Sequence, residues 1–448
     1  MTGIEHAVAG GVPGGLLVAR VLMALTLGYH IILACLGVGL PVMMLFAEWR
    51  FLRTADMGWK TLARRWSKAF TVLFAVGAVS GTILSFELGL LWPEFMGTFG
   101  AVIGLPFTLE AFAFFLEAIF LGIYLYTWDH LPPRLHWLSG FPVAVAGLAS
   151  AWLVVTANAW MNTPRGFEMA NGVVTDADPV AVMLNPATAT QTAHMMLAAY
   201  FVTGFLVASV YAVAMLRGKN RLHHRRALSL ALALGALCAP LQLVVGDASS
   251  RMVGRTQPAK LAAMEGQFRT QAGAPLRIGG FPDEQAMETR WAIEIPKMLS
   301  WLVHGDADAV IRGLDDFPPE DRPPVAIVHL SFQVMVAIGA GLTLLGGWAG
   351  WALWRRRFPG GRTFLWLTAV SGPLAVVALE CGWVVTEVGR QPWIVQGVMR
   401  TAEAVTDAPG IPWVLAPLGV VYVVLTVGLV ASLRFLARKP LPEADHAA

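Results

Sequence analysis

The sequence predicts an all-α membrane protein with nine spanning helices, and three observations support this fold class. The 448 residues are 56% hydrophobic and only 14% charged, whereas a soluble chain is roughly 25% charged. Apolar runs of spanning length recur from one end of the chain to the other. Basic residues gather in alternate connections between these runs. We therefore expect one transmembrane domain over residues 1–448.

The nine apolar segments have about the length that a helix needs to cross the hydrocarbon core, roughly 20 residues. The first is too long for the core of a signal peptide, so we expect it to be retained as a span. Trp49, Trp92, Trp160 and Trp354 lie at segment ends, as aromatic side chains at a membrane interface do. The segments are Leu16–Trp49, Phe70–Trp92, Ala101–Tyr126, Trp137–Trp160, Thr190–Leu216, Ala227–Val245, Val325–Trp354, Thr363–Val388 and Ile411–Phe435.

Lysine and arginine residues predict how the chain is oriented. They are concentrated after the first, fifth, seventh and ninth segments. The short connections on the other side hold only Arg165, Arg390 and Arg400. Because cytoplasmic loops carry the excess of basic residues, the N-terminus is expected outside and the C-terminus in the cytoplasm.

One connection is far longer than the others. Residues 246–324, between the sixth and seventh segments, form a polar, proline-containing stretch on the predicted outer face. Long ordered loops are uncommon unless they are functional, so we expect this large loop to recognise a substrate or partner. The chain has no evident internal repeat, which argues against an inverted-repeat transporter.

The end of the eighth segment contains more polar residues than a lipid-facing helix needs. Glu380 and Glu387 are seven residues apart, so they project from one face of a helix. A carboxylate inside a membrane is costly and usually faces a cavity or takes part in chemistry. The helix is expected to end at Gly389 and Pro392, with Arg390 at the membrane surface. This stretch predicts a cofactor site.

Other polar residues lie inside the apolar segments. His30, near the middle of the first, is equally compatible with a packing residue and a ligand. Arg20 lies nearer the outer surface, and a guanidinium buried there would need an anion such as a haem propionate. In the third segment, Glu110 and Glu117 lie two turns apart on one face. They indicate a proton path or a ligand site, with pairing to a buried base as the alternative.

A histidine and a methionine on different segments lie at comparable depth. His194 begins the fifth segment, and Met335 lies about 15 Å into the seventh at 1.5 Å per residue. Such a pair can supply both axial ligands of a low-spin haem. The chain has 18 methionines, so spacing alone makes this a weak indication. Glu87, near the outer end of the second segment, could reach the interface and is assigned no role.

Residues 382–393 read Gly-Trp-Val-Val-Thr-Glu-Val-Gly-Arg-Gln-Pro-Trp. They resemble the GWxxxExGRQPW signature of subunit I of the cytochrome bd quinol oxidase family, and the resemblance extends over nearly the whole chain. The large loop is similar to the quinol-binding Q-loop of that family. The other matching positions are Arg20, His30, Glu110, Glu117, His194, Lys260, Glu265 and Met335.

The resemblance implies three haems: a low-spin b, a high-spin b, and a third of type d or b. His194 and Met335 would ligate the low-spin haem. His30 and Glu387 would serve the two high-spin haems, and which residue holds which haem is left open. Trp383 would lie between haems.

It also implies roles for the remaining polar residues. Glu110 and Glu117 would contact the high-spin haems and deliver protons from the cytoplasm. Lys260 and Glu265 would hydrogen-bond the quinol head group. Arg390 would belong to the haem-binding and catalytic site.

Two departures from the family pattern stand out. Gln333, two residues before Met335, occupies a position where many members carry arginine, and losing that charge should lower the potential of the low-spin haem. The large loop also resembles the short form of the Q-loop. Short-loop relatives include the cyanide-insensitive oxidases, in which a b haem can replace the d haem.

The implied function is a quinol:O2 oxidoreductase that oxidises ubiquinol or menaquinol at the outer face and reduces O2 with cytoplasmic protons. Its partners would be subunit II and a small single-helix subunit in a bacterial cytoplasmic membrane, with no nucleic acid. Two alternatives stay open at this point. One is an ion-coupled transporter that uses the intramembrane carboxylates. The other is a haem subunit that transfers electrons without reducing O2.

Overall fold

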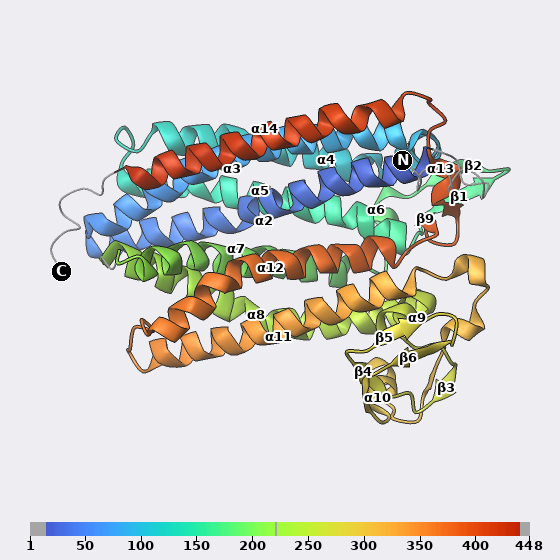
Figure 1. The fold of residues 1–448 in the computed structure, drawn as a ribbon. Coiled ribbons are helices and arrows are strands. Elements are labelled where there is room, and N and C mark those ends of the chain that lie inside the picture. The colour runs from blue at the N-terminus through green and yellow to red at the C-terminus, as the bar shows by residue number, and fades with distance from the viewer. Residues whose placement is uncertain (1–14, 220–221, 440–448) are drawn as a thin grey trace.

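The computed structural model describes residues 15–219 and 222–439. Long helices lie side by side, and the larger connections gather at the end opposite the C-terminus (Figure 1). Within the described ranges, nine helices are long and apolar enough to cross a membrane, as predicted. They are α2 (Leu16–Thr54), α3 (Met57–Leu91), α4 (Pro93–Tyr126), α5 (Pro133–Asn162), α7 (Thr188–Leu216), α8 (Leu222–Thr256), α11 (Val325–Trp354), α12 (Arg362–Val388) and α14 (Ile411–Arg438).

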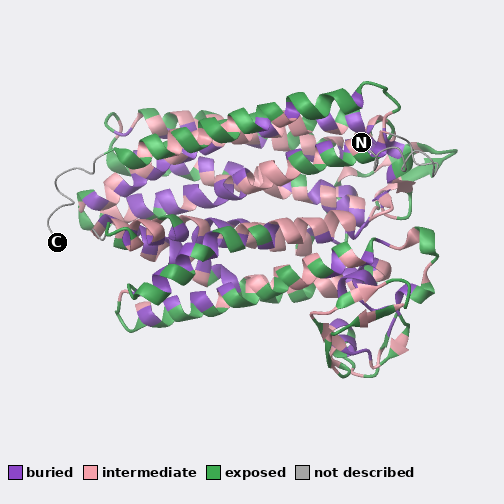
Figure 2. Ribbon diagram, in the orientation of Figure 1, coloured by how far each residue is buried: buried purple, intermediate pink, exposed green. Residues whose placement is uncertain are grey.

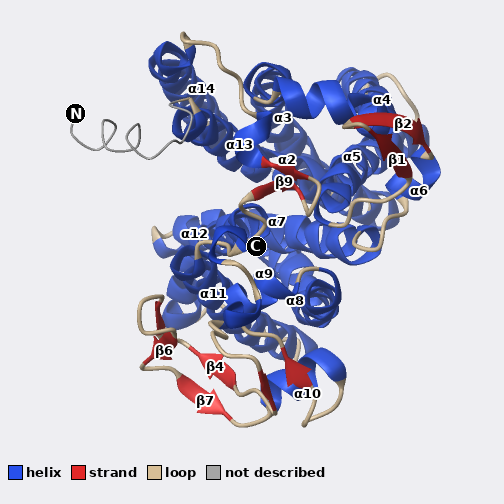
Figure 3. Cartoon of the chain, turned by 90° about the vertical axis from the view of Figure 1, so that its right-hand side faces the viewer, coloured by secondary structure: helices blue, strands red, loops and turns tan. Residues whose placement is uncertain are grey.

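Eight of these helices form two groups of four. In the first bundle, α2 and α4 each pack against α3 and α5. In the second bundle, α7 and α11 each pack against α8 and α12. Figure 3, which looks along the helices, separates the two groups. Contacts of α2 and α5 with α7 join the bundles, and α14 lies outside them along α3 and α2.

Helices α3, α4 and α8 extend well beyond their apolar runs, and α4 begins at Pro93 rather than near Ala101. Helix α3 begins at Met57 rather than near Phe70, because the side chain of Asp56 caps it by accepting a hydrogen bond from the Gly58 N–H at 2.9 Å. Helix α8 continues to Thr256, so the first part of the predicted loop is helical. Helix α12 ends at Val388, immediately before Gly389, as predicted.

Small residues bring helices of both bundles into close contact. A Cβ atom built on Gly204 of α7 would lie 2.6 Å from the backbone nitrogen of Gly235 on α8. Where α2 meets α7, the Thr203 hydroxyl donates to the Cys35 carbonyl at 2.9 Å. Close approach at small residues is how helices associate in lipid. Helix α14, in contrast, is exposed over most of its length (Figure 2).

Three buried polar side chains join helices of the first bundle at the end nearer the C-terminus. Oε2 of Glu48 on α2 accepts a hydrogen bond from the Tyr124 hydroxyl of α4 at 2.7 Å. Oε1 pairs with Nδ1 of His136 on α5 at 2.6 Å. The other ring nitrogen of His136 lies 2.9 Å from the Tyr124 carbonyl. We call these residues the Glu48 cluster.

Short elements cover the other end of the bundles. Strands β1 and β2 form a hairpin, and β9 pairs with β10. The large loop, residues 257–324 in the structure, lies beside α11 (Figures 1 and 3). In it β3 pairs with β8, β4 with β7 and β5 with β6, all antiparallel. The elements are β1 (Phe167–Ala170), β2 (Val173–Ala177), α6 (Pro179–Met183), α9 (Pro258–Glu265), β3 (Gln271–Ala272), β4 (Leu276–Ile278), β5 (Phe281–Asp283), β6 (Glu288–Arg290), β7 (Ile293–Ile295), α10 (Met298–His304), β8 (Val310–Ile311), η1 (Leu314–Asp316), η2 (Pro319–Asp321), β9 (Trp393–Val395), β10 (Met399–Arg400) and α13 (Thr401–Ala404).

Candidate functional site

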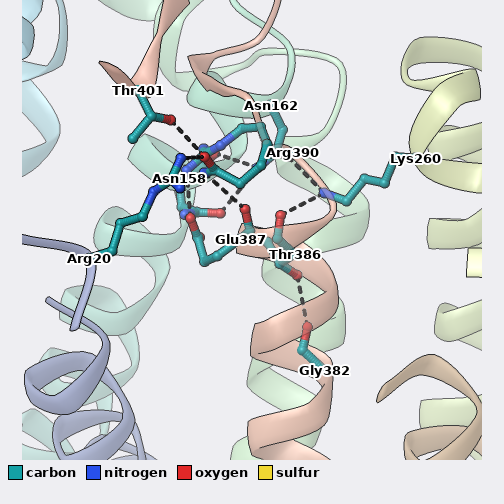
Figure 4. Close-up of polar contacts among 10 residues, drawn as sticks. Arg20, Asn158, Asn162, Lys260, Gly382, Thr386, Glu387, Arg390 and Thr401 are labelled. Atoms are coloured by element: carbon teal, nitrogen blue, oxygen red, sulfur yellow. Dashed lines mark hydrogen bonds and ion pairs between the residues drawn. The ribbon is translucent and has the colours of Figure 1, made fainter. Parts of the chain in front are cut away.

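The end of α12 meets several other elements in a hydrogen-bonded network, which we call the α12 network (Figure 4). Oε1 of Glu387 accepts a hydrogen bond from Nδ2 of Asn158 on α5 at 2.5 Å. Oε2 accepts one from Nη2 of Arg390, also at 2.5 Å. Each carboxylate oxygen has two lone pairs, so both oxygens of Glu387 keep one for a metal ion.

Arg390 is buried and only partly satisfied. Its side chain is bonded to Glu387, but Nε and Nη1 have no partner among the described residues. A buried donor without an acceptor costs about 1–3 kcal/mol, and more when it is charged. These two unpaired donors fit an anionic group such as a carboxylate.

The expectation that Arg20 is buried is wrong. Arg20 lies in the second turn of α2, where its side chain is exposed at the helix end. Its Nη2 donates to Oε1 of Gln391 at 2.6 Å. The same oxygen accepts a hydrogen bond from the Thr401 hydroxyl at 2.9 Å. Arg20 therefore links the start of α2 to the segment that follows α12.

Lys260 connects the large loop to the α12 network. It lies buried in α9, and its Nζ donates to Oδ1 of Asn162 at 3.0 Å and to the Thr386 carbonyl at 2.8 Å. Burial, and secondarily the charge of Arg390, lowers the pKa of Lys260 to about 7. Below that pH Lys260 is an ammonium group with three N–H donors, so one remains for a ligand.

Glu265 ends the same short helix but points elsewhere. Five residues separate it from Lys260, which places the two side chains about 140° apart around the helix. Its Oε2 is buried without a partner, and burial raises the pKa of Glu265 to about 7 against the opposing charge of Arg277. A carboxyl group that titrates near neutral pH can exchange a proton with a ligand.

His194 and Met335 lie on the two helices of the second bundle that do not neighbour each other, α7 and α11. The two ring nitrogens of His194 are 3.3 and 3.1 Å from Nε2 of Gln242 on α8. A Cβ atom built on Gly246 of α8 would lie 3.3 Å from the His194 ring. One built on Gly382 of α12 would lie 3.0 Å from the Met335 sulfur. The absence of side chains at these glycines leaves room for both candidate ligands.

His30 has the same kind of surroundings in the first bundle. Its Nδ1 lies 2.9 Å from the Ser80 hydroxyl of α3, and a Cβ atom on Gly81 would lie 3.0 Å from its Cε1. A hydrogen bond at one ring nitrogen orients the ring and leaves the other nitrogen for a metal. All three candidate iron ligands with a ring or a sulfur therefore face a glycine on an adjacent helix.

Glu110 and Glu117 are both directed from α4 toward α5. The Ser150 hydroxyl donates to Oε1 of Glu110 at 2.9 Å. Glu117 is 5% exposed and faces Gly147, where a Cβ atom would lie 3.0 Å from its Oε1. Within residues 15–219 and 222–439, neither carboxylate forms a salt bridge, so pairing with a buried base finds no support.

Two further predicted positions lie close to these residues. Trp383 is half-buried on α12, one turn before Glu387. The amide of Gln333 binds the large loop: its Oε1 accepts from the Gly279 N–H at 3.0 Å, and its Nε2 donates to the Arg277 carbonyl at 3.0 Å. In this chain, Gln333, two residues before the candidate ligand Met335, thus holds the large loop in place.

Sequence analysis missed the half-buried Asn158 and the buried Asn162, and it misplaced Glu87. Asn158 and Asn162 lie four residues apart on α5, and Nδ2 of Asn162 donates to the Asn158 carbonyl at 3.0 Å. Two asparagines at this spacing in an apolar helix are a signal that could have identified them. Glu87 is buried rather than at the interface, and neither of its oxygens has a partner among the described residues.

A model of the cytochrome bd terminal oxidase subunit I family matches residues 18–441. The chain belongs to this family. A protein of Bacillus subtilis (strain 168), named as a candidate cytochrome bd menaquinol oxidase subunit I, is 40% identical over 433 residues, 95% of this chain and 97% of that protein. Cytochrome bd ubiquinol oxidase subunit 1 of the same strain is 30% identical over 431 residues, 93% and 92% of the two chains. The solved structure of bd oxidase from Geobacillus thermodenitrificans matches with a TM-score of 0.90 and 41% identity, covering 95% of this chain and 99% of that one.

Membership in the cytochrome bd family implies haem cofactors, and the residues of this subunit fit them. No group of three or more His, Cys, Asp or Glu side chains in the described ranges could hold a bare metal ion. A haem iron needs only one or two axial side chains, so isolated residues such as His30, His194 and Met335 suffice. The unpaired donors of Arg390 fit a haem propionate.

Proposed function

We propose that this cytochrome bd subunit I oxidises a membrane quinol at the outer face and reduces O2 to water with cytoplasmic protons. One observation supports this best. The α12 network links Lys260, the proposed quinol residue, to the proposed haem ligand Glu387 through Asn162 and Asn158. The names of the relatives, which specify menaquinol and ubiquinol oxidation, agree with this function. Which quinol this chain uses is left open.

Quinol oxidation is assigned to the large loop. Two N–H groups of Lys260 hold the loop against α5 and α12, and the third is free to donate to a quinol oxygen. The buried Glu265 would accept a quinol proton and release it outside. This sidedness rests on the basic residues, which place the large loop outside and the C-terminus in the cytoplasm.

The haem ligands are assigned by bundle. His194 and Met335, both on the second bundle, would hold the low-spin b haem. His30 of the first bundle and Glu387 of α12 would hold the two high-spin haems, one of type b and the other of type b or d, and which residue holds which haem is left open. When bound, haem supplies electron transfer and the reduction of O2. Trp383 would lie between haems.

Neighbouring side chains orient these proposed ligands. Ser80 orients the His30 ring, and Asn158 fixes one oxygen of Glu387. Arg390 fixes the other oxygen and keeps two donors for a propionate. Arg20 holds Gln391, the residue after Arg390, in place.

Protons for water formation are assigned to the first bundle. Glu110 and Glu117 lie two turns apart between α4 and α5, and Glu117 is nearer the cytoplasmic end. They would pass protons inward from the cytoplasm, while quinol protons leave on the outer side. Because water formation would take protons from the cytoplasm and quinol oxidation would release them outside, the two reactions would generate a proton motive force without a pump.

Family membership also implies a heterodimer with subunit II. We propose further that the complex lies in a bacterial cytoplasmic membrane, that a small single-helix subunit can join it, and that residues 1–448 form one haem-binding domain. Residues 257–324 would be a short Q-loop within that domain.

The test is a spectroscopic and kinetic study of the purified complex. We expect reduced-minus-oxidised spectra with one low-spin and two high-spin haem signals, three haems by pyridine haemochrome, and O2 consumption that depends on added quinol. A colourless protein would favour the transporter. A coloured protein that quinol reduces but O2 does not reoxidise would leave only the electron-transfer role.

A further inference from the structure

The large loop contains a bent two-stranded ribbon with exposed apolar side chains. Strand β4 pairs with β7 and β5 with β6, so both arms belong to one hairpin. The exposed side chains are Ile278, Phe281, Trp291 and Ile293, which we call the ribbon patch; Trp291 is 82% exposed. The Phe281 and Trp291 rings lie 6.1 Å apart between centroids. Contiguous exposed apolar residues of this kind mark a binding surface.

The backbone at the bend holds Trp291 outward. Gly279 and Gly280 have φ values of +68° and +92°, and Trp291 on the facing arm has φ +57°. A bulky residue at positive φ is disfavoured and persists only where the surrounding structure holds it. A tryptophan that is both strained and exposed contributes little to packing within the loop. Its placement therefore points to a partner outside the chain.

The bend is fastened to the side of α11. Gln333 makes two hydrogen bonds to the backbone there, to Gly279 and Arg277. His329, one turn earlier, places Nε2 3.1 Å from the Gly279 carbonyl and Nδ1 2.9 Å from the Met264 carbonyl. These contacts fix the ribbon beside a spanning helix instead of above the bundles, as Figures 1 and 3 show.

The position of the bend along α11 matches a membrane interface. From Gln333 to Trp354 the helix advances 21 residues, or about 32 Å, roughly the thickness of the hydrocarbon core. Trp354 is followed by three arginines, residues 355–357, which mark the opposite interface. The side of α11 near the bend is also apolar and exposed, at Ile327, Leu330 and Val334.

We propose that the ribbon patch is a membrane anchor that inserts into the interfacial region of the outer leaflet and holds the large loop against the bilayer. Aromatic side chains favour that region, and the patch continues the exposed apolar side of α11. The ribbon tip has no excess of positive charge: Arg290 lies 2.9 Å from both Asp283 and Glu288, and Glu284 adds a further carboxylate. Apolar insertion, rather than attraction to anionic lipids, is therefore the binding mode.

The experiment uses the complete oxidase in phosphatidylcholine nanodiscs. Trp291→Cys and Ile293→Cys are each spin-labelled, and collisions with O2 and with a water-soluble nickel complex are measured. Val310→Cys is the matched control, because Val310 is exposed on β8, which pairs with β3 on the side of the loop away from the helices (Figure 1). Labelled wild-type enzyme gives the background from native cysteines.

We expect the labels at 291 and 293 to collide with O2 and to lose collisions with the nickel complex, while the label at 310 stays accessible to nickel. Equal nickel accessibility at all three positions would overturn the proposal. Shielding of 291 and 293 from both reagents would also overturn it, because a protein partner would then cover the patch. Two labelled positions keep the test valid if one variant does not fold.

Discussion

Two buried carboxylates of the first bundle have opposite surroundings. Glu48 is 2% exposed, and each of its oxygens is occupied by a side chain from another helix, Tyr124 or His136. Glu117 is nearly as buried, yet it makes no hydrogen bond with any described residue and faces a glycine.

We interpret the difference as that between a structural carboxylate and a proposed functional one. Buried polar groups are normally paired because the unpaired state is costly. The Glu48 cluster meets this rule and so serves to join α2, α4 and α5. Glu117 has no such partners, and a carboxyl group left without them inside a membrane usually faces a cavity or takes part in chemistry. The candidate ligands His30, His194 and Met335 share one feature with Glu117, because each of them also faces a glycine.

The largest effect is expected from Glu48→Ala. It leaves the hydroxyl of Tyr124 and Nδ1 of His136 buried without the carboxylate that they contact, so the free energy of unfolding should fall by about 3–5 kcal/mol. Thermal unfolding and haem retention of the purified complex measure this. Glu48→Gln keeps an acceptor oxygen and should lie between wild type and Ala. A stable Glu48→Ala enzyme with slow turnover would erase the distinction between the two carboxylates.

Met335→Ala should abolish the low-spin haem signal and leave the high-spin signals detectable. Removing one axial ligand leaves the low-spin iron without its sixth ligand, whereas the high-spin haems use other residues. Optical and electron paramagnetic resonance spectra report the two classes separately. Met23→Ala, which truncates a partly buried methionine of α2, is the control. If the low-spin spectrum survives in Met335→Ala, a different methionine is the ligand.

Glu117→Gln should slow O2 consumption by about tenfold or more, equivalent to roughly 1.4 kcal/mol in the barrier. The amide keeps the size of the side chain but cannot release a proton. Stopped-flow reduction of the low-spin haem by quinol should keep its normal rate, since that reaction uses the outer face. Normal turnover in a fully haem-loaded variant would place Glu117 beside Glu48 as a structural residue.

The last prediction concerns the quinol site, where binding should weaken without loss of haem. Lys260→Ala removes one hydrogen-bond donor and should raise the KM for quinol. The increase should correspond to a loss of about 0.5–3 kcal/mol in binding free energy, with unchanged haem spectra. Because burial raises the pKa of Glu265 to about 7, the proton-accepting carboxylate forms only above that pH.

Quinol oxidation should therefore rise with pH through about 7, following the raised pKa of Glu265. The rise should vanish in Glu265→Gln and persist in Lys260→Ala, where only the lysine is lost. Initial rates between pH 5.5 and 8.5, at saturating quinol, measure this profile; the range spans about 1.5 units on each side of the pKa. A wild-type profile retained by Glu265→Gln would move the proton acceptor elsewhere.

Much of the fold was predictable from the sequence, because apolar runs of spanning length are local signals. The nine helices lie where the runs are, and α11 has the predicted bounds. The polar extensions of α3 and α8 were not predictable from apolar length. Residues 57–69 and 246–256 look like loop in composition but are held as helix by a cap and by neighbouring helices.

The candidate site was predictable only where it is local in sequence. The motif at residues 382–393 identified Glu387 and Arg390 together, since they lie within one turn. Asn158 reaches Glu387 across 229 residues, and no periodicity encodes such a contact. Arg20 is exposed and Glu87 is buried because of the positions of neighbouring helices around them. The sequence of one helix does not contain those positions.

The α12 network also sets the order of biogenesis. Gln391 binds both Arg20 and Thr401, so the site closes only after almost the whole chain has been made. At about 5–20 residues per second, translation needs roughly 20–80 s to pass from the first contributor to the last. During that time α2 and α7, the helices that bear His30 and His194, lie in the membrane before α12 and the segment after it are complete. We therefore expect stable haem insertion to be a late event, and a chain truncated before Arg390 would leave Glu387 held by Asn158 alone.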